Sequence, residues 1–178
     1  MEKVTVKDKV FIPYLAHQDI QARIQTLAQQ INADYQGLNP LFVAILNGSF
    51  MFAADLYKEI TLPSQITFVK VASYRGTSST GEVMTLLGMD MDLANRHVIL
   101  IEDIVDTGKT LSELLPKLKS NNPASIQIAA LLQKPEALKY PIDVKYVGFN
   151  IANEFIVGYG LDYDGYGRNL KDILKIEG

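Results

Sequence analysis

The stretch VILIEDIVDTGKTL, at residues 98–111, limits the possible folds more than any other part of the chain. It begins with four consecutive apolar residues, which is typical of a strand buried on both faces of a parallel sheet. A loop with three acids and a glycine follows before a helix is predicted from Thr110: Glu102, Asp103, Asp106 and Gly108. An open α/β sheet binds its ligand at this place, outside the carboxyl end of a strand. The stretch therefore predicts a buried strand, a ligand-binding loop and a helix.

The predicted loop combines two kinds of group that a sugar phosphate needs. Carboxylates accept hydrogen bonds from hydroxyl groups or bind a metal ion, and backbone N–H groups at a helix start bind phosphate. Clustered acids also raise one another's pKa, which suits an acid that takes up a proton. These features favour a site for a phosphorylated sugar.

Two alternatives fit parts of the same stretch. A P-loop would use Gly108-Lys109-Thr110, but it needs a glycine at the position of Asp103, where a carboxylate would repel a triphosphate. Residues 106–108 would also suit an ordinary turn that caps the helix. Such turns are common, whereas three clustered acids at the end of a buried strand are not, so we favour the ligand site.

The rest of the chain alternates apolar runs with helical patterns. Ile20, Ile24, Leu27 and Ile31 form a helical stripe, and residues 41–46 form a continuous apolar run. The pattern predicts helices at residues 19–34, 50–60 and 110–119, and strands at residues 10–13 (a short edge strand that ends at a proline), 41–46, 66–71, 98–101, 126–132, 144–149 and 156–159. Alternation of this kind is typical of a mostly parallel sheet with helices on both faces, in one α/β domain over residues 1–178.

Composition excludes several function classes. The chain has 178 residues, no cysteine and a net charge of −3, so thiol chemistry is excluded and nucleic acid is not the expected partner. Charges run through the first residues and no apolar run is long enough to cross a bilayer, so we expect a cytoplasmic protein without a membrane partner. His17 and His97 show no ligand spacing, and we expect both at the surface or at edges.

Several motifs together resemble the hypoxanthine-guanine phosphoribosyltransferase family of type I phosphoribosyltransferases. Besides the acidic stretch, they are LNGSF at residues 46–50, SYRGTSSTG at residues 73–81, Lys134 in LLQKPE and VGFNIANEFIVGYGLDYDGYGRNL at residues 147–170. The resemblance runs from about residue 42 nearly to the C-terminus. It implies a type I phosphoribosyltransferase fold with a small hood, formed partly by the C-terminal segment. It also implies transfer of a phosphoribosyl group from 5-phosphoribosyl pyrophosphate to a purine base, with Mg2+ as cofactor, in a homodimer or homotetramer.

The resemblance gives the acidic stretch its roles. It implies that Glu102 and Asp103 bind the ribose hydroxyls, directly or through Mg2+, and that Asp106 acts near purine N7 as general base. The 5′-phosphate would be held by residues 106–110, which include Thr107, Gly108, Lys109 and Thr110. Because the Lys109 side chain could simply point to solvent, we assign it no catalysis.

The resemblance also names the residues for the base. It implies that Lys134 donates a hydrogen bond to the purine O6, which would favour 6-oxopurines over adenine. Phe155 would stack on the base, although its spacing fits a core aromatic equally well. Ile156 would offer backbone groups to the edge of the base.

The remaining roles concern pyrophosphate. The resemblance implies that Asp162 holds Mg2+ and that Arg168 contacts the phosphates. Asn47 stands where the family has a lysine, so Gly48 and Ser49 would bind phosphate through their backbone N–H groups. The resemblance also implies that the Leu46–Asn47 peptide bond is cis. Ser73 and Tyr74 match the family's lid, which closes over the site at residues 73–81.

Two rival functions remain open. A regulatory protein could keep the fold and sense a nucleotide or an activated sugar, but it could dispense with Asp106 and with the lid. The same chemistry could also serve another base such as xanthine, which the residues around Lys134, Ile156 and Asp162 would decide.

Overall fold

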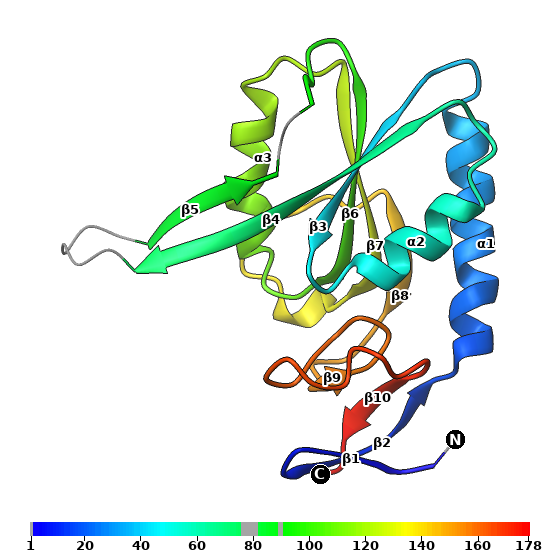
Figure 1. Ribbon diagram of the computed structural model, residues 1–178, viewed down its shortest axis with the longest axis vertical. Coiled ribbons are helices and arrows are strands. Elements are labelled where there is room, and N and C mark those ends of the chain that lie inside the picture. The colour runs from blue at the N-terminus through cyan, green and yellow to red at the C-terminus, as the bar shows by residue number, and fades with distance from the viewer. Residues whose placement is uncertain (1, 76–81, 89–90) are drawn as a thin grey trace.

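The fold consists of a large sheet covered by helices and a small separate sheet at one end (Figure 1). The computed structural model describes residues 2–75, 82–88 and 91–178. The large sheet has six strands in the order β5-β4-β3-β6-β7-β8. Their bounds are β3 Leu41–Leu46, β4 Gln65–Arg75, β5 Glu82–Leu87, β6 His97–Val105, β7 Ser125–Gln133 and β8 Tyr146–Asn150. All neighbours pair in parallel except β4 and β5, which are antiparallel.

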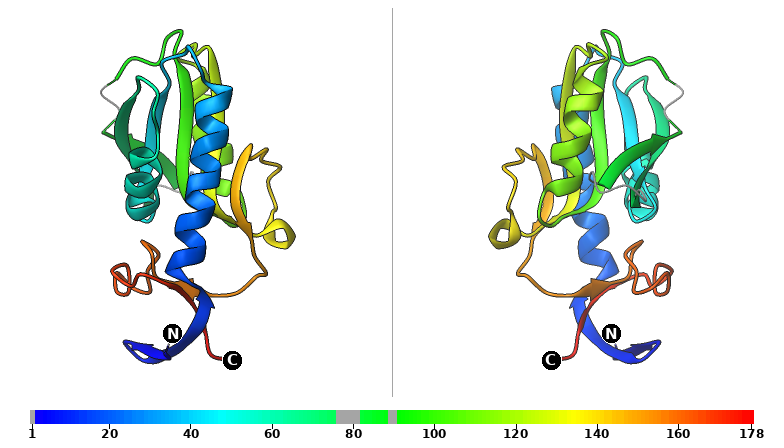
Figure 2. Two further views of the ribbon diagram at one scale, coloured as in Figure 1. Left: turned by 90° about the vertical axis from the view of Figure 1, so that its right-hand side faces the viewer. Right: turned by 90° about the vertical axis from the view of Figure 1, so that its left-hand side faces the viewer.

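Helices cover both faces of this sheet, as the sequence predicts (Figure 2). Their bounds are α1 His17–Asp34, α2 Phe50–Lys58 and α3 Lys109–Lys119, and a short 3-10 turn spans Pro135–Ala137. Side chains alternate along β6, so Ile99 and Ile101 pack with α1 and α2 while Val98 and Leu100 pack with α3. The apolar run at residues 98–101 is therefore buried on both faces, and its carboxyl end is where the acids begin.

The small sheet forms the predicted hood at the carboxyl ends of the parallel strands (Figure 1). It has the order β1-β2-β10-β9, with bounds β1 Val4–Val6, β2 Lys9–Leu15, β9 Ile156–Val157 and β10 Ile173–Ile176. The C-terminal segment contributes as expected, and the N-terminal strands complete the sheet.

The expectation of a short edge strand that ends at Pro13 is wrong. β2 continues to Leu15 and lies between β1 and β10, with Pro13 opposite Leu174. The register of this pair shifts at Ile173 and Leu174, and such an irregularity is a place where a strand tolerates a proline. The sequence pattern did not predict β1, β5 or β10, because strands of three to six residues carry little periodicity.

The predicted lid is described only in part. Ser73 and Tyr74 lie in β4, where they pair with Met84 and Val83 of β5. Residues 76–81 lie outside the described residues, so the lid stays a prediction. Among the residues described, no helix is long and apolar enough to cross a membrane.

Candidate active site

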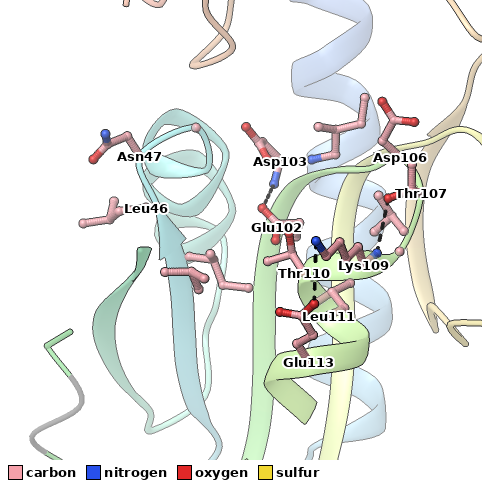
Figure 3. Close-up of a pocket in the computed structure, with 16 residues that line it drawn as sticks. Leu46, Asn47, Glu102, Asp103, Asp106, Thr107, Lys109, Thr110, Leu111 and Glu113 are labelled. Atoms are coloured by element: carbon pink, nitrogen blue, oxygen red, sulfur yellow. Dashed lines mark hydrogen bonds and ion pairs between the residues drawn. The ribbon is translucent and has the colours of Figure 1, made fainter. Parts of the chain in front are cut away.

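A pocket of about 470 Å³ opens where the sequence places the ligand, at the carboxyl ends of β3 and β6 (Figure 3). The loops after both strands and the first turns of α3 line it. Seven predicted residues of the acidic stretch are among the lining residues, as are both predicted residues of the β3 loop: Glu102, Asp103, Asp106, Thr107, Gly108, Lys109, Thr110, Asn47 and Gly48. Val71, Ile104 and Leu111 also line the pocket, and only their place in the fold identifies them.

Glu102 and Asp103 form a buried acid pair at the end of β6. Glu102 is 7% exposed, and its Oε1 accepts a hydrogen bond of 3.2 Å from the backbone N–H of Asp103. The Oδ1 of Asp103 accepts one of 2.8 Å from the N–H of Ile104. Burial, and then the charge of Asp103, raises the pKa of Glu102 well above its usual value, and burial raises the pKa of Asp103 as well. The pair is therefore a place where a nearby cation would be favourable.

The acid pair has the chemistry of a partial Mg2+ site. Mg2+ prefers one or two carboxylates and completes its shell with waters and substrate phosphates. Within the described parts of the chain, no group of three or more His, Asp or Glu side chains gathers as a metal cluster. Two hard carboxylates beside an anion-binding loop thus fit an ion that arrives with a phosphorylated substrate.

Asp106, which lines the pocket, forms an ion pair with Lys134, which is not among the lining residues. The Nζ of Lys134 lies 3.1 Å from Oδ2 of Asp106, and the lysine side chain is 8% exposed against 47% for the aspartate. The backbone N–H of Lys134 donates to the carbonyl of Val105, which fixes the start of the side chain. The partner of Asp106 is thus a cation, whereas the sequence suggested mutual repulsion among the three acids.

The loop from Thr107 to the start of α3 is held by its own backbone. Gly108 has a φ of +80°, and a Cβ there would lie 2.7 Å from the carbonyl oxygen of Tyr140. The backbone N–H groups of Lys139 and Tyr140 donate to the Thr107 carbonyl. The start of α3 therefore faces the pocket with the positive end of the helix dipole.

The side chain of Lys109 lies at the edge of the pocket beside α3. Its Nζ lies 4.0 Å from Oε1 of Glu113, one turn further along the helix, and the side chain is half exposed. That Lys109 has no catalytic role stays a prediction.

The loop after β3 closes against the acid pair. The Leu46–Asn47 peptide bond is cis, as predicted. A Cβ on Gly48 would lie 1.6 Å from Oδ2 of Asp103, so only glycine allows this approach. In Figure 3 the side chain of Asn47 points away from Asp103. The loop thus reaches the acids through its backbone.

The predicted pyrophosphate residues lie in the hood, next to that loop. Arg168 donates from Nη1 to the carbonyl of Gly160 (2.7 Å) and pairs from Nη2 with Oδ1 of Asp162 (2.8 Å). A Cβ on Gly160 would lie 2.1 Å from the carbonyl oxygen of Gly48. The charge of Arg168 acts against burial on the pKa of Asp103, which places it within electrostatic reach of the acid pair.

Phe155 belongs to a cluster of aromatic rings in the hood. It is 45% exposed and meets the ring of Tyr163 edge-on at 5.8 Å, with Phe11 at 6.1 Å. Ile156 is buried in β9 beside it. An exposed aromatic ring that packs against two others is available for stacking. No sequence pattern identified the two supporting rings, Phe11 and Tyr163.

Comparison with known proteins agrees with this arrangement. Residues 13–164 match the model of the phosphoribosyl transferase domain. Hypoxanthine-guanine phosphoribosyltransferase of Mycobacterium tuberculosis is 43% identical over 166 residues, which cover 89% of this chain and 82% of that protein. The enzyme of that name from Streptococcus thermophilus is 44% identical over 156 residues and 87% of each chain.

Solved structures agree as well. The crystal structure of a hypoxanthine phosphoribosyltransferase from Staphylococcus aureus has a TM-score of 0.87 and 39% identity, and covers 93% of this chain and 91% of that one. A hypoxanthine-guanine phosphoribosyltransferase from Bacillus anthracis also has a TM-score of 0.87, with 35% identity over 96% of this chain and 99% of that one.

Proposed function

The chain belongs to the phosphoribosyltransferase family, among relatives named for hypoxanthine and guanine, and from this premise we propose that it makes nucleotides from these bases. The bond from ribose C1 to the pyrophosphate of 5-phosphoribosyl pyrophosphate breaks. A bond from C1 to a purine ring nitrogen forms, and the nucleotide and pyrophosphate leave. One observation carries the proposal: the 3.1 Å pair of Asp106 and Lys134 puts an acceptor and a buried donor beside the acid pair and the start of α3.

One side of the pocket, formed by the end of β6 and the start of α3 and here called the sheet side, would bind the sugar. Glu102 and Asp103 would accept hydrogen bonds from the ribose hydroxyls, and their charge would stabilise the positive character that develops at C1. The 5′-phosphate would lie at the start of α3, against the backbone N–H groups of residues 107–110 and the hydroxyls of Thr107 and Thr110.

Lys134 and Asp106 would read the base. An ammonium group only donates hydrogen bonds, so it suits the O6 of hypoxanthine or guanine and leaves the amino group of adenine unpaired. Asp106 would take the proton of the base at N7, while Phe155 would stack on the ring and Ile156 would offer backbone groups to its edge. On binding, the base would share the existing ion pair rather than meet two free charges.

The hood and the β3 loop would hold the leaving pyrophosphate. Arg168 suits phosphate oxygens through its planar guanidinium group, and the N–H of Gly48 lies beside the acid pair. Ser73 and Tyr74 would reach over the pyrophosphate and exclude water, which would limit hydrolysis of the activated sugar.

Glu102 and Asp103 would hold Mg2+ beside the ribose hydroxyls, and Asp162 in the hood would hold Mg2+ that is bound to the pyrophosphate. When bound, it supplies positive charge that neutralises the pyrophosphate as the C1 bond breaks. Asp162 is paired with Arg168, so this carboxylate would exchange part of that contact for the ion.

We expect a homodimer or homotetramer located in the cytoplasm, on the basis of the family resemblance. Light scattering coupled to size-exclusion chromatography measures the assembly directly.

The test is formation of the hypoxanthine nucleotide from hypoxanthine, 5-phosphoribosyl pyrophosphate and magnesium chloride. We expect equal amounts of nucleotide and pyrophosphate, and loss of both products when EDTA removes the ion. Tight binding of the sugar or the nucleotide without turnover of hypoxanthine, guanine, xanthine or adenine would reject the enzyme and favour the regulatory alternative.

A further inference from the structure

A partly buried hydrogen-bond cluster joins the hood to α1 and α2 outside the pocket. The hydroxyl of Tyr159 donates to Oδ2 of Asp55 at 2.5 Å. The Nε2 of Gln21 donates to the same Oδ2 at 2.8 Å and to the Tyr159 hydroxyl at 3.2 Å. None of these three side chains lines the pocket, and the reaction described above uses none of them. We call the three residues the 21–55–159 clamp.

Tyr159 is a buried side chain on a backbone conformation that is uncommon for a tyrosine. It is 2% exposed, lies 6.2 Å from the ring of His17 and has a φ of +49°. A non-glycine residue in this conformation is strained, so the contacts of the side chain must offset the strain. Burial and the hydrogen bond to Asp55 raise the pKa of Tyr159, which keeps its hydroxyl a donor at any working pH.

The residue after Tyr159 touches the active-site loop. Gly160 approaches the carbonyl of Gly48 so closely that a Cβ would lie 2.1 Å from the oxygen. Arg168 is tied to this same residue in two ways, through its Nη1 on the Gly160 carbonyl and through its own carbonyl on the Gly160 N–H (3.0 Å). A shift of Tyr159 would therefore move Gly160 and Arg168 together relative to Gly48.

A second hydrogen bond joins the hood to the helices. The backbone N–H of His17 donates to Oδ1 of Asp172 at 2.7 Å, at the start of α1. The Asp172 tie holds the strand end of the hood, whereas the clamp holds the turn that carries Gly160.

We propose that Tyr159, fastened by Asp55 and Gln21, is the positioning residue for the pyrophosphate half of the site. Its hydroxyl sets where Arg168 and Asp162 lie over the loop of Gly48, without touching the substrate. The inference rests on the proposed function, which it deepens by assigning the pyrophosphate geometry to a buried contact between the hood and α2.

The first test is Tyr159→Phe, which keeps the buried ring and removes only the hydroxyl. We expect the KM for 5-phosphoribosyl pyrophosphate to rise about 5- to 20-fold, as expected when a charge contact is misplaced, with the KM for hypoxanthine and kcat within about threefold. Tyr57→Phe is the matched control. Tyr57 lies on α2, as Asp55 does, and its hydroxyl donates to the carbonyl of Ser64 at 3.1 Å, away from the hood. The control should leave all three constants unchanged.

The second test separates the clamp from the exposed partner of Asp55. Asp55→Ala should reproduce the defect of Tyr159→Phe, and the double variant should add little to it, because both changes remove one contact. Lys58→Ala removes the ion pair of Lys58 with the other oxygen of Asp55 and should have no such effect. If Tyr159→Phe fails to fold, Gln21→Met weakens the same cluster and takes its place.

Binding measurements keep the two proposals distinct. If wild-type protein forms no nucleotide, the proposed function fails, and calorimetry with inorganic pyrophosphate and magnesium chloride then tests the clamp by itself. We expect a 5- to 20-fold weaker Kd in Tyr159→Phe than in wild type or Tyr57→Phe. An unchanged Kd and KM, or equal loss in both substrate constants together with a lowered Tm, would overturn the clamp as a positioning device.

Discussion

The two sides of the pocket are built in different ways. The sheet side comes from one continuous stretch, in which Glu102 and Asp103 lie near the end of β6, Asp106 follows the strand directly and α3 starts at Lys109. The hood side is assembled from both ends of the chain, since β2 near the N-terminus pairs with β10 near the C-terminus. Backbone bonds and buried carboxylates fix the first side, whereas side-chain contacts such as those of Tyr159 hold the second.

This difference indicates that the two sides of the pocket have different roles. Under the proposed function, the bond-breaking chemistry would rest on the side whose geometry the sheet dictates, and a loop at a strand end is the usual place for it. The hood would hold the pyrophosphate and stack on the base. Variants on the sheet side should therefore lower kcat or change stability, and variants in the hood should chiefly change KM.

The largest expected effect comes from Asp106→Asn on the sheet side. Loss of the general base should lower kcat about 10²- to 10⁴-fold, while the Kd for the nucleotide changes only a few-fold because size and hydrogen bonding are nearly kept. Steady-state kinetics and calorimetry measure the two quantities. Equal losses in turnover and binding would reject the role as base.

Gly108→Ala should have the next largest effect, on stability. The alanine would keep a φ of +80° and press on the carbonyl of Tyr140, so we expect the free energy of unfolding to fall by about 2–4 kcal/mol. Gly37→Ala is the matched control, because Gly37 has a φ of +77° and no atom within 4 Å of the added Cβ. Its loss should be about 1–2 kcal/mol in urea unfolding. Equal losses in the two variants would show that the contact with Tyr140 contributes nothing.

Glu102→Gln should stabilise the protein while it removes activity. Burial raises the folded pKa of Glu102 and of Asp103, so the folded state binds their protons more tightly than the unfolded state does. The stability that this binding contributes is fully present below the unfolded pKa and is lost as the pH rises through the folded pKa. Removing one buried charge should raise the free energy of unfolding at pH 8 by about 0.5–2 kcal/mol. Below the unfolded pKa of these acids the difference should disappear. A variant that is less stable than wild type at pH 8 would contradict the strained acid pair.

The smallest effect is expected for Lys109→Ala. Its Nζ is half exposed and 4.0 Å from Glu113, so both stability and kcat/KM should change by less than about 0.5 kcal/mol, or about twofold. Loss of more than tenfold in kcat/KM would show that the Lys109 charge binds phosphate and that the backbone of α3 does not suffice.

The sequence predicted the sheet side well because its signals are local. The apolar run at residues 98–101, the acids after it and the helix that follows are all readable from neighbouring residues, and the structure confirms them. The resemblance also led to the cis bond at Leu46–Asn47. The Asp106–Lys134 pair was missed, although both residues were named, because sequence spacing does not show which side chains meet.

The hood was less predictable because its contacts join distant segments. β1 has three residues and β10 has four, too few for a clear alternation, and each is stabilised by pairing with β2. Pro13 suggested an edge because a proline cannot donate to a neighbour, but the shifted register opposite it removes that demand. The role of Tyr159 depends on Asp55, which lies 104 positions away.

The most direct measurement is turnover of hypoxanthine, guanine, xanthine and adenine side by side, in wild type and in Lys134→Gln, with 5-phosphoribosyl pyrophosphate and magnesium chloride. We predict that wild type uses hypoxanthine and guanine at least about 10²-fold better than adenine in kcat/KM, and that Lys134→Gln loses most of this preference. Wild-type turnover of adenine as fast as hypoxanthine, or a preference that survives in Lys134→Gln, would contradict it.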